Sequence, residues 1–169
     1  MNLNLKILLL IGSINIYSND LISRFNNLIL NDMEFVQQTN INSKIDESVG
    51  KIYRKNNFIE VEIFKPSKEK YVIKNNVIEV HDFDFDQISY IYINDQDSHI
   101  LSLLKNGINT NNVKKISGNT FVIDNMNKLL QVEFKSEEEF IISYEDNMNF
   151  RNSINFKSIN KQWILYWLE

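Results

Sequence analysis

The chain of 169 residues contains no cysteine, no alanine, a single proline and only four glycines. Without cysteine it can form no disulfide, no thiolate metal site and no cysteine nucleophile, and it offers no cysteine for a lipid anchor. It also lacks a phosphate-binding glycine loop, a nucleophile elbow and a zincin motif. These absences exclude the most recognisable enzyme classes.

The sequence also has no segment in which charges of one sign are concentrated. The formal net charge is -4 and lysine, aspartate and glutamate are scattered along the sequence. A surface for nucleic acid or for an anionic membrane is therefore not expected. The hydrophobic content of 43% is sufficient for one core, and the length suggests one domain.

The N-terminus predicts a signal peptide over residues 1–18 and a single mature domain over residues 19–169. One lysine precedes an apolar stretch that begins at Ile7, and Ser18 is a small residue at the expected cleavage point. The stretch is too short to span a membrane stably. A buried first strand or helix is the alternative interpretation. With a signal peptide, the protein would be located in the periplasm.

Alternation of apolar and polar residues between 50 and 89 predicts a series of antiparallel strands. Ile59, Val61 and Ile63 alternate with charged or aromatic neighbours, which is the two-residue period of a strand. Polar pairs and Pro66 separate the runs, as turn residues do. The same reasoning predicts helices over residues 20–31 and 98–105. Further strands are expected over residues 35–38, 120–123, 129–134, 140–144, 153–158 and 163–168.

These elements predict a mainly β (α+β) fold. About ten short strands with one or two helices suggest a strongly curved sheet or open barrel with helices on one face. An enclosed apolar cavity is the natural product of such a shape.

Two histidines are the only candidates for enzyme chemistry. His81 precedes Asp82, Asp84 and Asp86, a spacing that could form a metal site, but these aspartates are common turn residues. His99 follows Asp97 and Ser98, and residues adjacent on one turn cannot form a catalytic relay, so helix capping is the favoured interpretation. We therefore expect no enzyme, no metal and no cofactor.

Several short motifs follow one another in order between residues 35 and 107. The chain has Phe-x-Gln at 35–37, glycine at 50, arginine at 54, an aromatic at 58, proline at 66, an Asp-rich hairpin at 82–86 before Gln-Ile, and Leu-Leu-x-x-Gly at 103–107. In this order and spacing the chain resembles the outer-membrane lipoprotein carrier family, LolA. The resemblance covers most of the chain beyond residue 20.

The resemblance implies a fold and a function. The fold would be an incomplete, strongly curved antiparallel β-barrel with a helical lid over an apolar cavity. The function would be that of a monomeric periplasmic chaperone that takes acylated lipoproteins from an inner-membrane ABC transporter to the outer-membrane receptor LolB. The carrier itself hydrolyses nothing. A periplasmic binder of another lipid, or an envelope-stress sensor on the same fold, remains the alternative.

The resemblance also implies site residues. The lid would consist of residues 21–30 and 98–105. Arg54 would be the lid latch, which holds the lid by hydrogen bonds to its main-chain carbonyls. The acyl-chain cavity would be lined by Phe35, Ile52, Phe58, Phe64, Leu101 and Leu104.

The sequence departs from the family in the same region. Lys55 and Glu60 stand where the family usually has proline and tryptophan, and the family's C-terminal Pro-Gly segment is missing. Glu60 on the cavity face would need a partner, and Arg54 is one candidate. Alternatively, Ile59, Val61 and Ile63 face inward and Glu60 faces solvent, because a one-residue slip exchanges the two faces of a strand.

Overall fold

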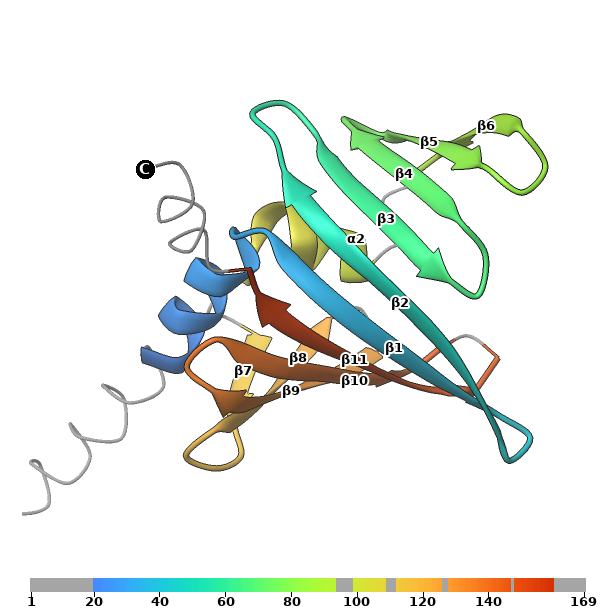
Figure 1. The fold of residues 1–169 in the computed structure, drawn as a ribbon. Helices are drawn as coiled ribbons and strands as arrows, with labels where there is room; N and C mark the ends of the chain where they lie inside the picture. Colours follow the sequence, from blue (N-terminus) through green and yellow to red (C-terminus); the bar gives the residue numbers. More distant parts are fainter. Residues whose placement is uncertain (1–19, 94–98, 109–111, 126–127, 147, 160–169) are drawn as a thin grey trace, which may run out of the picture.

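A computed structural model describes residues 20–93, 99–108, 112–125, 128–146 and 148–159. The predicted signal peptide (1–18) and the predicted strand over 163–168 lie outside these residues. Within them the fold is mainly β, with eleven antiparallel strands in one open, curved sheet and two helices (Figure 1). No helix within the described ranges is both long and apolar enough to cross a membrane.

The chain forms the sheet as one long meander in two halves. Six strands run in sequence order from β1 to β6, a helix follows, and five more strands return so that β11 pairs with β1. The sheet therefore ends at β6 and β7, which do not pair with each other. The strands are β1 (Met33–Ile41), β2 (Lys44–Arg54), β3 (Ile59–Lys65), β4 (Glu69–Lys74), β5 (Val77–Asp82), β6 (Gln87–Tyr92), β7 (Val113–Lys115), β8 (Thr120–Asn125), β9 (Lys128–Ser136), β10 (Glu139–Glu145) and β11 (Arg151–Ser158).

Both predicted helices are present. The N-terminal helix covers residues 20–29, and α2 (His99–Asn106) lies between the two halves of the sheet. Gly107 ends α2 with a φ of 68°, a conformation that glycine adopts without the strain a side chain would cause, and its amide donates to the Leu103 carbonyl at 2.9 Å. Figure 1 shows both helices on the same side of the sheet.

The core lies between the N-terminal helix and strands β8–β11. Phe25 is fully buried and meets Phe121 and Phe140 edge-on at centroid distances of 5.8 and 5.0 Å. Phe140 also stacks on Phe156 at 5.2 Å. Such aromatic pairs stabilise the fold beyond the effect of the area they bury. Together with Ile29 and Met33, which are also fully buried, they fix the N-terminal helix onto this half of the sheet.

One close approach between β1 and β2 requires a glycine. Gly50 pairs with Phe35, and a Cβ at this position would lie 2.6 Å from the Phe35 ring and 2.3 Å from the Glu62 carbonyl oxygen. The phenylalanine ring therefore lies over the glycine on the inward face. This contact explains why position 50, one of the motif positions named above, is a glycine.

Candidate functional site

The side chains of strand β3 that face the helices are those of Ile59, Val61 and Ile63. Ile59 is buried, and Val61 and Ile63 pack against the core cluster, whereas Phe64 is 42% exposed. Glu60 forms an ion pair with Lys70 of β4 at 2.8 Å and not with Arg54. Because side chains alternate along a strand, the inward set is 59, 61 and 63. Of the two interpretations of this strand, the one with Glu60 facing away from the cavity is correct.

An apolar groove lies between this inward face and α2. Its volume is about 280 Å³. Four of the six predicted cavity residues line it, namely Phe35, Ile52, Leu101 and Leu104. The other lining residues are Gln37, Val61, Ile63, Tyr71, Ile73, Ile78, Ile100, Ile154 and Phe156.

Two of the predicted cavity residues are elsewhere, and the sequence interpretation was wrong for them. Phe64 has the parity of the outward face of β3, so its ring points away from the groove. Phe58 precedes β3 in the turn where its carbonyl accepts a hydrogen bond from the Lys55 amide at 3.1 Å, and it does not line the groove. Val61 and Ile63 line the groove instead of Phe58 and Phe64. The alternation of Ile59, Val61 and Ile63 in the sequence indicated this inward face.

Arg54 connects the two helices at one end of the groove. Its guanidinium donates to the main-chain carbonyls of Ile29, the last residue of the N-terminal helix, and of Leu104 in α2. Carbonyls in the last turn of a helix have no partner within the helix, and they carry the negative end of its dipole. One planar group with several fixed donors satisfies both.

Asp32 holds the Arg54 backbone in place. The Asp32 carboxylate accepts a hydrogen bond from the Arg54 backbone amide at 2.7 Å. Burial lowers the pKa of the Arg54 guanidinium below its usual value, and the nearby Asp32 charge opposes this shift. An arginine stays protonated even so, because its usual pKa lies far above neutrality.

Asn26 makes a second link that the sequence did not reveal. Its side-chain oxygen accepts from the Ile108 amide at 2.7 Å, and its side-chain nitrogen donates to the Ile108 carbonyl at 3.1 Å. The N-terminal helix thus binds the segment that follows α2. A third contact, from the Lys105 ammonium to the Asn75 carbonyl in the β4–β5 turn, holds the last turn of α2.

The groove becomes polar at its far end. Gln37 and Thr39 of β1 face Asn152 of β11, and the Thr39 hydroxyl lies 2.7 Å from the Asn152 side-chain oxygen. Asn152 is only 5% exposed, and its amide also donates to Asp146 at 3.2 Å. This buried polar network borders the apolar surface of the groove, to which β11 contributes Ile154 and Phe156.

The two histidines belong to different elements of the fold. His81 lies on β5 and pairs with Glu79 at 2.5 Å, while His99 opens α2. Asp82 closes the β5–β6 turn by accepting from the amides of residues 84 and 85 at 3.0 and 3.2 Å, so its function in a turn is directly visible. Within the described ranges no three histidine, aspartate or glutamate residues gather as metal ligands would.

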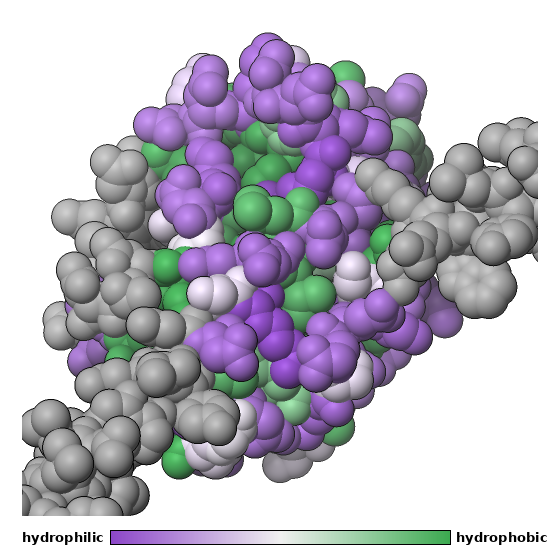
Figure 2. Space-filling model, turned by 90° about the vertical axis from the view of Figure 1, so that its left-hand side faces the viewer, coloured by the Kyte–Doolittle hydropathy of each residue, from purple (hydrophilic) through white to green (hydrophobic). Residues whose placement is uncertain are grey.

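The surface around the helices is mostly hydrophilic. Figure 2 shows apolar side chains in small areas between polar ones on the face that lies to the left in Figure 1. A larger hollow of about 940 Å³ lies on the opposite face of the sheet, lined mainly by polar side chains. The lining of the apolar groove, by contrast, suits a hydrocarbon ligand.

Fold and site together define a class of protein: an open antiparallel sheet with two helices beside an apolar groove. The chain matches no protein-family model and no curated protein. Among solved structures it is similar to an uncharacterized conserved protein from Thermus thermophilus, with 13% identity, a TM-score of 0.46, and 88% of this chain and 91% of that chain covered. A DUF1329 family protein from Desulfovibrio piger matches with 10% identity, a TM-score of 0.42, and coverage of 82% and 89%. These similarities are too distant to carry an argument about function.

Proposed function

We propose that this protein is a periplasmic carrier of acyl chains, which binds acylated lipoproteins and delivers them from an inner-membrane ABC transporter to the outer-membrane receptor LolB. The observation that carries the proposal is the position of Arg54. One guanidinium joins the ends of both helices directly beside an apolar groove. The ordered motifs between residues 35 and 107 support the same function.

The physical need for such a carrier is large. Each methylene that leaves water contributes about 0.8 kcal/mol, so a free acyl chain does not cross an aqueous compartment easily. A groove lined by aliphatic and aromatic side chains replaces the membrane interior during transfer. Tyr71 adds a polar group to this groove, and both burial and a hydrogen bond to Glu69 raise the pKa of its phenol, so it remains neutral.

The groove has to widen to accept a whole chain. Its volume of about 280 Å³ lies just below the range of roughly 300–1,000 Å³ typical of ligand pockets. Ile100, Leu101 and Leu104 form its wall on α2, so displacement of α2 enlarges it. Re-exposing a leucine costs about 1.5–3 kcal/mol, and a bound acyl chain offsets this cost by covering the same surface.

In this proposal α2 is the movable part of the lid and Arg54 is its latch. The N-terminal helix is anchored in the core by Phe25 and Ile29, both fully buried. Helix α2 contributes Leu103 and Leu104 to the core, while Ile100 and Leu101 are only partly buried beside the groove. An empty carrier closes when Arg54 binds both carbonyls, and a loaded carrier loses at least one of these bonds.

The same geometry suits a binder of another lipid or a sensor of envelope stress, since neither needs different groove chemistry. Lipid that copurifies with the protein, identified by mass spectrometry, distinguishes these functions. Lipoprotein-derived acyl chains support the carrier. A single free lipid species, with no transfer of lipoprotein to LolB, supports the alternative.

A pair of neighbouring substitutions tests the groove itself. Val61→Trp fills the inward face, and Glu62→Trp places the same side chain on the outward face of the same strand. We expect the first variant to weaken binding of a fluorescent fatty acid at least tenfold and the second to leave it unchanged. Thermal unfolding of both variants checks that they are folded. Equal affinity of the two variants would contradict the assignment of the groove.

A further inference from the structure

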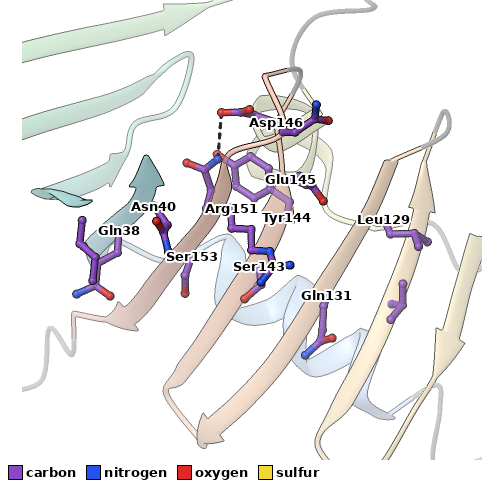
Figure 3. A pocket seen from close by; sticks show the side chains of 14 residues that line it. Gln38, Asn40, Leu129, Gln131, Ser143, Tyr144, Glu145, Asp146, Arg151 and Ser153 are labelled. Carbon is purple, nitrogen blue, oxygen red and sulfur yellow. Dashed lines mark hydrogen bonds between the residues drawn. The ribbon is translucent and has the colours of Figure 1, made fainter. Parts of the chain in front are cut away.

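A hollow lies on the face of the sheet that points away from both helices. It has a volume of about 940 Å³ and is lined mostly by outward side chains of strands β1, β2 and β8–β11, together with Tyr144, Asn152 and the β10–β11 turn. Figure 3 shows the side chains of Gln131, Ser143 and Ser153 projecting from three neighbouring strands, with the N-terminal helix behind the sheet. We call this hollow the outer trough. The acyl-carrier proposal makes no use of it.

A cross-strand row of four uncharged polar residues forms the floor of the outer trough. Gln38 pairs with Ser153, Ser153 with Ser143, and Ser143 with Gln131. The two short serines lie in the middle and the two long glutamines at the sides, so the side chains leave a hollow between the glutamines. At the usual spacing of roughly 4.8 Å between strands, the two glutamines are about 14 Å apart.

The charged residues of the trough are one arginine, Arg151, and two carboxylates, Glu145 and Asp146. Arg151 pairs with Glu145 on one side and with Asn40 on the other. Asp146, which also lines the trough, accepts hydrogen bonds from the amides of residues 148 and 150 and from Asn152, and so closes the β10–β11 turn. The trough therefore carries little net charge for a ligand to neutralise.

Apolar side chains stand at both ends of the row beside the floor. Leu129 on β9 and Ile45 on β2 line the trough, and each is 65% exposed. These exposed aliphatic side chains flank the row that contains Arg151 and offer contact surfaces for the C–H groups of a ligand. The floor row beside it continues into Glu47, which accepts a hydrogen bond from the Gln38 amide at 3.1 Å, and into Val122. The remaining amide and hydroxyl groups of the floor can both donate and accept hydrogen bonds.

We propose that the outer trough binds a neutral oligosaccharide. Such a ligand presents many hydroxyl groups, each a donor and an acceptor, next to patches of C–H surface, and it carries no charge. The trough offers the complementary set, which is a row of amides and hydroxyls, no excess of cations, and exposed aliphatic side chains in the row beside it. An anionic ligand would require an excess of cations, and Arg151 is the only cationic residue among the described residues that line the trough.

The proposal is tested by titrating the full chain with two neutral trisaccharides, maltotriose and the trimer of N-acetylglucosamine, and with an acidic one, the trimer of galacturonate. The change in backbone amide NMR shifts is the readout. We expect saturable binding of at least one neutral trisaccharide, with shifts concentrated on strands β9–β11, and no saturation by the acidic one. Saturation by neither neutral trisaccharide, or stronger binding of the acidic one, overturns the proposal.

Variants connect the binding to the trough. Ser143→Leu fills the floor from the outward face and should weaken saccharide binding at least tenfold. Ser89→Leu makes the same change on the exposed strand β6 and should leave it unchanged. Gln131→Ala, which removes an amide without adding bulk, is the second test and should weaken binding several-fold. Saccharide affinity unchanged in both Ser143→Leu and Gln131→Ala would refute the site.

Binding of a fluorescent fatty acid to the same variants separates this site from the apolar groove. Since the two hollows lie on opposite faces of the sheet, Ser143→Leu should retain fatty-acid binding. Loss of saccharide binding with retained fatty-acid binding supports two independent sites. Loss of both in a folded variant contradicts their independence.

Discussion

The two halves of the sheet use their inward faces differently. Strands β8–β11 hold the residues that are almost completely covered, such as Phe121, Phe140 and Val132, each no more than 1% exposed. Strands β3–β5 contribute Val61, Ile63 and Ile78, which are only partly buried and line the apolar groove. Both faces are apolar, so hydrophobicity alone does not distinguish them. The difference is that the N-terminal helix packs closely on β8–β11, whereas space remains between α2 and β3–β5.

In this account, the half that packs against the N-terminal helix provides most of the stability, and the half beneath α2 provides the proposed binding site. The N-terminal helix places Phe25 among the rings of β8–β11 and is held further by Arg24, whose guanidinium lies 4.2 Å from the centroid of the Phe134 ring. Helix α2 covers the other half with smaller side chains and is attached near its C-terminal end. A tightly packed half can support a loosely covered one that accepts a ligand.

The largest expected effect concerns the packed half. Phe140→Ala removes a fully buried ring that contacts three other phenylalanines, and it should lower the free energy of unfolding by about 3–5 kcal/mol. Ile63→Ala in the groove should cost no more than about 2 kcal/mol, because the side chain is already partly exposed. Urea denaturation measures both. Equal losses would show that the groove half is as much a core as the other.

The next effect concerns the connection between the helices. Arg54→Leu leaves two helix-end carbonyls without donors and should lower the free energy of unfolding by about 1–3 kcal/mol. The closed, empty state loses stability most, so the variant should stay loaded but transfer lipoprotein to LolB poorly. Each 1.4 kcal/mol by which the closed, empty state is destabilised relative to the loaded state changes the release equilibrium about tenfold. Lys157→Leu, which removes an exposed cation on the outward face of β11, is the control.

Normal transfer by Arg54→Leu would show that the latch role is wrong. If Arg54→Lys, which keeps one charge but loses the planar fork, transferred as well as the wild type, the two simultaneous carbonyl bonds would not be needed.

The smallest effect concerns the outward face of the groove half. Glu60→Gln removes one charge of the ion pair with Lys70 and should change the free energy of unfolding by less than about 1 kcal/mol, since the pair is partly solvated. Fatty-acid binding should be unchanged. A double-mutant cycle with Lys70→Met isolates the pair. A clear loss of fatty-acid affinity in Glu60→Gln would mean that the face assignment of β3 is incomplete.

Much of the fold could be read from the sequence because it depends on short-range patterns. The alternation at Ile59, Val61 and Ile63 predicted a strand, and the sequence pattern over residues 98–105 predicted the helix that is α2. Both are confirmed. The sequence pattern did not decide which of the two faces of β3 is inward, and the family resemblance favoured Phe58 and Phe64. Their aromatic character was misleading, because facing direction depends on parity and not on residue type.

Long-range polar contacts could not be predicted. Asn26 binds the backbone of Ile108, 82 positions further along the chain, and an asparagine in a helix carries no local sign of such a partner. Arg54 was found through a positional resemblance, and its two contacts come from residues 25 and 50 positions away. The outer trough follows from strand register between β1, β11, β10 and β9, which the sequence does not specify.

The central claim is that an acyl chain binds on the inward face of β3 beneath α2. A photoreactive phenylalanine analogue at position 63 faces the groove, and the same analogue at position 64 faces outward, although the two positions are adjacent. With a radiolabelled acylated lipoprotein in cells, the account predicts strong crosslinking from position 63 and none above background from position 64. Crosslinking that is equal at the two positions, or stronger from position 64, would contradict it.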